Sequence, residues 1–94
     1  MSVALPSGSV TAMQKKLFFQ ASRRSMAEVE RILSRFIESE LQSLDDQTCH
    51  RVLDFLDQPD PDILDWITGV ISPPESIDRD VLSRLTRFRI ETFP

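Results

Sequence analysis

Glycine, tyrosine and cysteine are scarce in this chain. Its 94 residues include two glycines, no tyrosine and one cysteine. A β-sandwich needs many turns, and turns draw on glycine, so the scarcity of glycine argues against an all-β fold. Cys49 has no second cysteine to pair with, which excludes an internal disulfide and is typical of a reducing compartment. The composition instead favours one small helical domain with a thin margin of stability.

Long apolar runs are also missing. No run approaches the roughly 18 residues that a membrane-spanning helix needs, so we expect no membrane insertion. Residues 1–12 lack the basic start and apolar centre of a signal peptide, and they lack the arginines of a mitochondrial presequence. The cytoplasm is therefore the default location. We predict a flexible tail over residues 1–13, followed by a single domain over residues 14–92.

The chain has no excess of basic residues, and its formal charge is −4. An acidic protein repels phosphate backbones, which argues against nucleic-acid binding. The charges are unevenly spread: residues 1–35 carry six positive and two negative side chains, whereas residues 36–65 carry one positive and nine negative. Such a dipolar molecule suits a protein partner with complementary charged patches.

Apolar residues recur with helical spacing in five segments. The clearest is residues 26–44, where they follow i, i+3, i+4 and i+7 spacing over about five turns. We therefore predict an all-α fold, a small five-helix bundle with short loops. The other expected helices cover residues 14–23, 46–57, 61–68 and 77–88.

Several residues mark the expected helix ends. Asp45, Asp60 and Ser76 are the predicted N-caps of the last three helices. Pro61 follows Asp60 at the first helical position, where its missing N–H costs nothing. Gly69 is the expected stop of the fourth helix.

The stretch "QASRRSMAEVERI" (residues 20–32) contains a pair of arginines between two expected helices. Ser25 followed three residues later by Glu28 predicts a capping box at the start of the second helix. Capping does not explain Arg23 and Arg24. We expect these arginines to present guanidinium groups to a carboxylate or phosphate on another molecule.

No candidate active site or metal site emerges from the sequence. His50 is the sole histidine, and its helical neighbour Cys49 points in a different direction, which argues against a Cys–His pair. A calcium loop starting at Asp60 would need glycine and glutamate where Asp65 and Ile71 stand. We therefore expect neither catalysis nor metal binding.

Two aromatic features leave alternatives open. Trp66 is either a core residue or a residue with one edge at an interface. Phe18 and Phe19 are adjacent, so one of them must lie away from the apolar face of its helix. The exposed one is either a contact residue or part of helix-end packing. The acidic residues from Asp57 to Asp65 form either a solvated face or a partner surface.

Two segments resemble one protein family. Arg24-Ser25-Met26-Ala27-Glu28 resembles the RGxxE motif of the FAD assembly factors, also called flavinators or succinate dehydrogenase assembly factor 2. The segment "FLDQPDPDILDWITG", followed by two prolines, resembles the acidic stretch with leucine and tryptophan of that family. The resemblance covers roughly residues 14–90 and includes the order of five helices.

The resemblance implies an assembly chaperone without enzymatic activity of its own. Such a protein binds the flavoprotein subunit of succinate dehydrogenase or fumarate reductase and promotes covalent attachment of FAD to a histidine of that subunit. FAD would act on the client and would not bind stably to this chain. The implied location is the bacterial cytoplasm or the mitochondrial matrix, and the free protein would be a monomer.

The resemblance also implies a partner-binding site. Its residues are Arg23, Arg24, Ser25, Glu28 and Glu30, and the secondary partner surface is Asp57, Asp60, Asp62 and Trp66. Ser25 stands where the family has a glycine, which would allow positive φ and close approach of a partner. Serine either leaves the turn intact or weakens docking. The alternative function is an interaction module of the same fold that serves another client and has weakened flavinylation activity.

Overall fold

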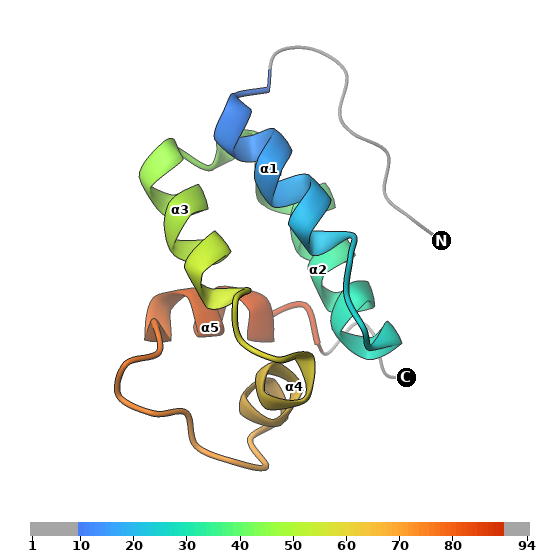
Figure 1. Cartoon of the computed structure of the whole chain (residues 1–94), viewed down its shortest axis with the longest axis vertical. Coiled ribbons are helices and arrows are strands. Elements are labelled where there is room, and N and C mark those ends of the chain that lie inside the picture. The colour runs from blue at the N-terminus through green and yellow to red at the C-terminus, as the bar shows by residue number, and fades with distance from the viewer. Residues whose placement is uncertain (1–9, 90–94) are drawn as a thin grey trace.

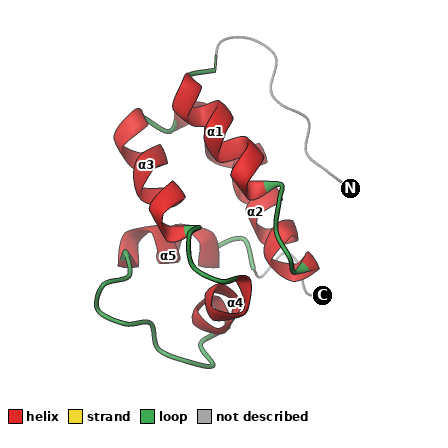
Figure 2. Cartoon of the chain, in the orientation of Figure 1, coloured by secondary structure: helices red, strands yellow, loops and turns green. Residues whose placement is uncertain are grey.

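The computed structural model describes residues 10–89, and within them all regular structure is helical (Figure 1, Figure 2). The elements are α1 (Ala12–Ala21), α2 (Ala27–Glu40), the 3₁₀ helix η1 (Leu41–Ser43), α3 (Asp46–Phe55), α4 (Asp60–Thr68) and α5 (Arg79–Thr86). The predicted all-α fold with five helices is confirmed. The predicted tail and the end of the predicted domain fall mostly on residues 1–9 and 90–94, which lie outside the described residues.

Helix α1 begins two residues before the predicted start because a capping box forms there. The backbone N–H of Gln14 donates to the hydroxyl of Thr11 at 3.0 Å, and the N–H of Thr11 donates to the side-chain oxygen of Gln14 at 3.0 Å. The side-chain Nε2 atom of Gln14 also donates to the backbone carbonyl of Leu44 at 2.9 Å. Gln14 is therefore a buried polar residue that fastens the start of α1 to the segment after η1.

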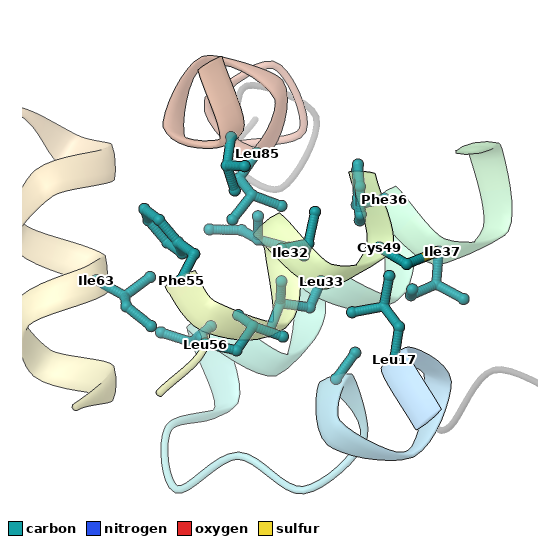
Figure 3. Close-up of a cluster of buried hydrophobic side chains, with 14 of the residues drawn as sticks. Leu17, Ile32, Leu33, Phe36, Ile37, Cys49, Phe55, Leu56, Ile63 and Leu85 are labelled. Atoms are coloured by element: carbon teal, nitrogen blue, oxygen red, sulfur yellow. The ribbon is translucent and has the colours of Figure 1, made fainter. Parts of the chain in front are cut away.

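Side chains from all five helices meet in one hydrophobic core (Figure 3). Phe36 on α2 and Leu17 on α1 are fully buried. Phe18 is buried and Phe19 is 47% exposed. The prediction that one of the two adjacent phenylalanines lies away from the apolar face of the helix is therefore confirmed. Cys49 is fully buried, and burial raises the pKa of its thiol, as expected for a cysteine that serves as a small apolar residue.

Trp66 belongs to this core. It is 9% exposed, and its ring lies edge-on to that of Phe55 with centroids 6.0 Å apart. Assigning Trp66 to a secondary partner surface was therefore wrong, because its apolar area is already used inside the domain.

Helix α4 ends where the sequence predicts. Gly69 has φ of 79°, a left-handed conformation that favours glycine, and the next two backbone N–H groups both donate to the carbonyl of Asp65. A long loop then leads to α5 (Figure 2). Val70 and Ile71, at its start, are exposed.

The N-cap of α5 is Asp78, and the prediction of Ser76 was wrong. Ile77 is buried, and its N–H donates to the carbonyl of Pro74 in a turn, so the helix starts only after this turn. One Asp78 oxygen accepts the N–H groups of Asp80 and Val81, both at 3.1 Å. The predicted N-cap Asp45 of α3 is confirmed, since it accepts the N–H of Thr48 at 2.7 Å.

Asp78 also joins α5 to α3. The Arg51 guanidinium on α3 donates to both Asp78 oxygens, at 2.8 and 2.9 Å. These hydrogen bonds lower the pKa of Asp78 to about 2 against the opposing effect of burial. Cap and ion pair together make this carboxylate the polar link between the two helices.

Replacing Asp78 with alanine should lower the free energy of unfolding by about 1–2 kcal/mol, because α5 loses its cap and Arg51 keeps only its contact with Asp80. Ser76→Ala is the matched control, with an expected change within about 0.5 kcal/mol. Urea unfolding followed by circular dichroism measures both. Equal losses for the two variants would contradict this assignment of the cap.

Candidate partner-binding site

Residues 22–26 connect α1 to α2 and carry Arg23, Arg24 and Ser25 of the predicted site, and Glu28 follows in the first turn of α2. Figure 1 shows this connection descending from the end of α1 to the start of α2, in the region of α4. Ala27 begins α2, and Met26 occupies its N-cap position without a side-chain cap. The polar groups of the connection must therefore find partners elsewhere in the fold.

Arg24 points inward. Its side chain is 7% exposed, and its Nε and Nη2 atoms donate to Asp60 Oδ1 at 2.9 and 2.7 Å. Nη2 also donates to the carbonyl of Leu56 at 3.0 Å, and Nη1 donates to the carbonyl of Gln20 at 3.3 Å. The expectation that Arg24 presents its guanidinium to another molecule was wrong, because internal oxygen atoms already occupy its donors.

Asp60 is the shared acceptor for the second half of the connection, Arg24, Ser25 and Met26. While Oδ1 takes the guanidinium, Oδ2 accepts the backbone N–H groups of Ser25 at 2.7 Å and Met26 at 3.1 Å. The Ser25 hydroxyl donates to the same oxygen at 3.2 Å. Asp60 is 4% exposed, so its assignment to a secondary partner surface was wrong. Its assignment as the N-cap of α4 was also wrong, because Asp60 is the first residue of the helix. Pro59 stands at that N-cap position.

Four helix ends meet at this ion pair. The guanidinium contacts carbonyls at the C-terminal ends of α1 and α3, where the helix dipole is negative. The carboxylate contacts N–H groups at the start of α2 and itself lies in the first turn of α4, where the dipole is positive. We call this arrangement the helix-end junction, made of Arg24, Asp60 and the backbone groups of Gln20, Ser25, Met26 and Leu56.

The surroundings favour the charged form of Asp60. Burial alone would raise the pKa of this carboxyl, but hydrogen bonds from Arg24 and from the backbone N–H groups of Met26 and Ser25 outweigh it. The pKa of Asp60 therefore lies below its ordinary value. Removing one member of such a buried pair typically costs about 3–5 kcal/mol, because the other charge is left buried alone.

The predicted capping box between Ser25 and Glu28 does not form. Asp60 takes the place of a local cap, because it lies within reach of two N–H groups that precede α2. Every non-glycine residue in the described part of the chain has negative φ, so Ser25 adopts its backbone conformation without strain. The turn does not need a glycine here, and serine adds one hydrogen bond to Asp60.

The remaining predicted residues divide by exposure. Arg23, Ser25 and Glu28 are exposed around the junction, and Glu30 is half-buried. On the acidic side, Asp57 and Asp62 are exposed. The predicted set thus contains an exposed part that a partner can reach and a buried part, Arg24, Asp60 and Trp66, that it cannot.

Sequence reasoning missed the pairing of Arg24 with Asp60. Both residues were singled out, but 36 positions separate them and each has a plausible local explanation. The available signal was that the two family-like segments carry opposite charges near predicted helix ends, and opposite helix ends favour opposite charges.

The described residues contain neither a candidate metal site nor a candidate membrane span. No group of three or more histidine, cysteine, aspartate or glutamate side chains is placed to hold a metal ion within residues 10–89. None of the described helices combines the length and the apolar character that a bilayer crossing requires.

Acid should weaken the fold through Asp60. Its folded pKa is below the unfolded value of about 3.9, so its contribution is complete above about pH 5 and is lost as the pH falls through the folded pKa. Urea unfolding at several pH values should show a shallower acid loss in Arg24→Met/Asp60→Asn, where residue 60 no longer titrates. Parallel curves for this variant and the wild type would contradict the assignment.

Ser25→Gly should lower the free energy of unfolding by about 0.5–1 kcal/mol, since it loses the bond to Asp60 and gains freedom in the unfolded chain. Ser39→Gly is unsuitable as a control because it lies inside α2; Ser72→Gly, in the loop before α5, is exposed and better matched. Thermal unfolding measures both. A more stable Ser25→Gly variant would show that serine is strained at this turn.

Comparison with known proteins supports a common family. The family model described as "Flavinator of succinate dehydrogenase" matches residues 15–89. The protein "Succinate dehydrogenase assembly factor 2, mitochondrial" from Dictyostelium discoideum is 32% identical over 73 residues, which are 78% of this chain and 52% of that protein. The chain thus spans about half the length of this relative.

Two bacterial relatives match as well. "FAD assembly factor SdhE" from Coxiella burnetii is 33% identical over 63 residues, covering 67% of this chain and 77% of that protein. The protein of the same name from Acetobacter pasteurianus is 25% identical over 77 residues, covering 82% and 71%. No solved structure matches the chain. The resemblance noted in the sequence is confirmed: the chain belongs to the family of flavinators of succinate dehydrogenase.

Proposed function

We propose that this protein is an assembly factor that binds the flavoprotein subunit of succinate dehydrogenase and promotes covalent attachment of FAD to it. The observation that carries the proposal is the family match over residues 15–89, which includes both the α1–α2 connection and α4. The flavoprotein subunit of fumarate reductase is a second candidate client. An interaction module serving another client is the alternative.

The proposed contact surface is the exposed part of the predicted site, Arg23, Ser25 and Glu28, together with half-buried Glu30 at its edge. Arg23 in the connection and Glu28 in the first turn of α2 bring opposite charges to one short stretch, which favours a partner surface that also carries both signs. Phe19 adds an exposed apolar ring one helical turn before Arg23. Asp57 and Asp62 are the retained members of the secondary surface.

The chemistry of flavin attachment is assigned to the client and its FAD. When bound to the client, FAD supplies the reactive ring, and this chain would hold the client in the conformation that reacts. The protein is accordingly proposed to be an accessory factor, not an enzyme, and a monomer when free. Its compartment would be that of its client, the bacterial cytoplasm or the mitochondrial matrix.

One depression on the described surface is a poor match for the pyrophosphate of FAD. This depression of about 370 Å³ between α3 and the segment before α5 is lined by Arg51, Asp54 and Asp78, among others. A pyrophosphate there would meet two carboxylates, and the Arg51 guanidinium already donates to Asp78 and Asp80. This donor set supports the proposal that FAD stays on the client.

Replacing Glu28 with alanine should reduce both affinity for the flavoprotein subunit and covalent flavin by about tenfold, equivalent to about 1.4 kcal/mol. Glu28 is exposed, so stability should change by less than about 0.5 kcal/mol. The measurement is flavin fluorescence of the denatured subunit after co-expression with each variant, using the succinate dehydrogenase and fumarate reductase subunits in parallel.

Glu38→Ala is the matched control, because Glu38 is also an exposed glutamate of α2 and lies nearer its other end. It should support wild-type flavin attachment. If wild-type protein neither binds either subunit nor raises its covalent flavin, the proposed function is wrong. Arg24→Ala does not serve this purpose, since it would disturb the fold and the docking surface together.

A further inference from the structure

The backbone between the exposed contact residues Arg23 and Glu28 is held by one carboxylate oxygen of Asp60. Asp60 Oδ2 accepts the N–H groups of Ser25 and Met26, the two residues that lead into α2. Arg23 lies two residues before this pair, where its N–H donates to the carbonyl of Gln20 at 3.3 Å, and Glu28 lies two residues after it. Asp60 therefore sets the backbone between the two exposed side chains. Without an acceptor at this place, the two N–H groups would turn toward water and the connection would lose its defined course.

We infer that Asp60 is a positioning residue for partner binding: it does not touch the partner but fixes the backbone of Ser25 and Met26, and thereby the position of Glu28 relative to Arg23. The inference rests on the proposed function, because it concerns how the proposed contact surface is ordered before the partner binds. Pre-organising a contact surface saves the ordering cost that a mobile loop would incur on binding.

Arg24 acts through Asp60. Its guanidinium occupies the other carboxylate oxygen and reaches the carbonyls of Gln20 and Leu56, so it fixes Asp60 relative to α1 and α3. With the side chain 7% exposed, little of Arg24 is left for a partner. Arg24 thus holds Asp60 in place, and Asp60 holds the backbone of Ser25 and Met26 in place.

The place of α4 makes this possible. Asp60 is the first residue of α4, and Ile63, one turn later, is fully buried in the core. The carboxylate is therefore anchored on a helix that the core holds in place, and not on the connection that it organises. A site held by a rigid element is more precise than one held by a loop.

Two double variants separate the positioning role from direct contact. Arg24→Met/Asp60→Asn and Arg24→Met/Asp60→Leu both remove the ion pair, and both lack the arginine. They differ at residue 60: asparagine keeps one oxygen that can accept the N–H groups of Ser25 and Met26, and leucine keeps none. Ile63→Val loses core packing without touching the junction and is the control for reduced stability.

The measurement is affinity for the flavoprotein subunit by calorimetry, at a temperature where circular dichroism shows each variant folded. We expect the asparagine double variant to bind the subunit at least about tenfold more tightly than the leucine double variant. We expect Ile63→Val to bind it like the wild type. Equal affinities for the two double variants would overturn the inference, because the oxygen at residue 60 would then be irrelevant.

Amide hydrogen exchange gives a second readout that needs no partner. In Arg24→Met/Asp60→Asn the N–H groups of Ser25 and Met26 should stay protected as in the wild type, and in the leucine variant, where it folds, they should exchange faster. Loss of their protection in the asparagine variant would overturn the inference. If wild-type protein fails to bind the subunit, the proposed function falls, and exchange alone decides whether Asp60 positions the turn.

Discussion

The buried pair of Arg24 and Asp60 is the interaction on which the arrangement of the helices depends. Each ion lies near two helix ends of the opposite polarity, so one pair satisfies backbone groups at the ends of α1 and α3 and at the start of α2, with its carboxylate carried by the first residue of α4. A buried ion pair is often no better than apolar packing in energetic terms, but it specifies one geometry. In a domain this small, a single polar contact can set where four helices begin and end.

This geometry divides the family motif into two kinds of residue. Arg24 is inside and Glu28 is outside, although both belong to the same short stretch. A buried arginine and an exposed glutamate fail in different ways when replaced, the first through the shape of the turn and the second through the surface it offers. Substitutions in one motif can therefore abolish function for unlike physical reasons.

Asp78 repeats the principle on the other side of the molecule. It caps α5 and at the same time binds Arg51 of α3, just as Asp60 belongs to α4 and binds Arg24 near α1. In both cases a carboxylate near a helix start is neutralised by an arginine from a distant segment. The acidic residues of the described chain are thus only partly a solvated face, and Asp60 and Asp78 are among those that link helices.

How much the sequence alone determined follows the range of the interactions involved. The all-α class, most core positions of α2, the Asp45 cap and the Gly69 stop depend on spacing and conformational preference within a few residues, and these were predictable. The inward turn of Arg24, the loss of the Ser25–Glu28 capping box and the burial of Asp60 were not. They depend on a contact between two residues 36 positions apart, which exists only where α4 packs against the core. Each polar group could be satisfied by several partners, and the tertiary structure alone decides which one it takes.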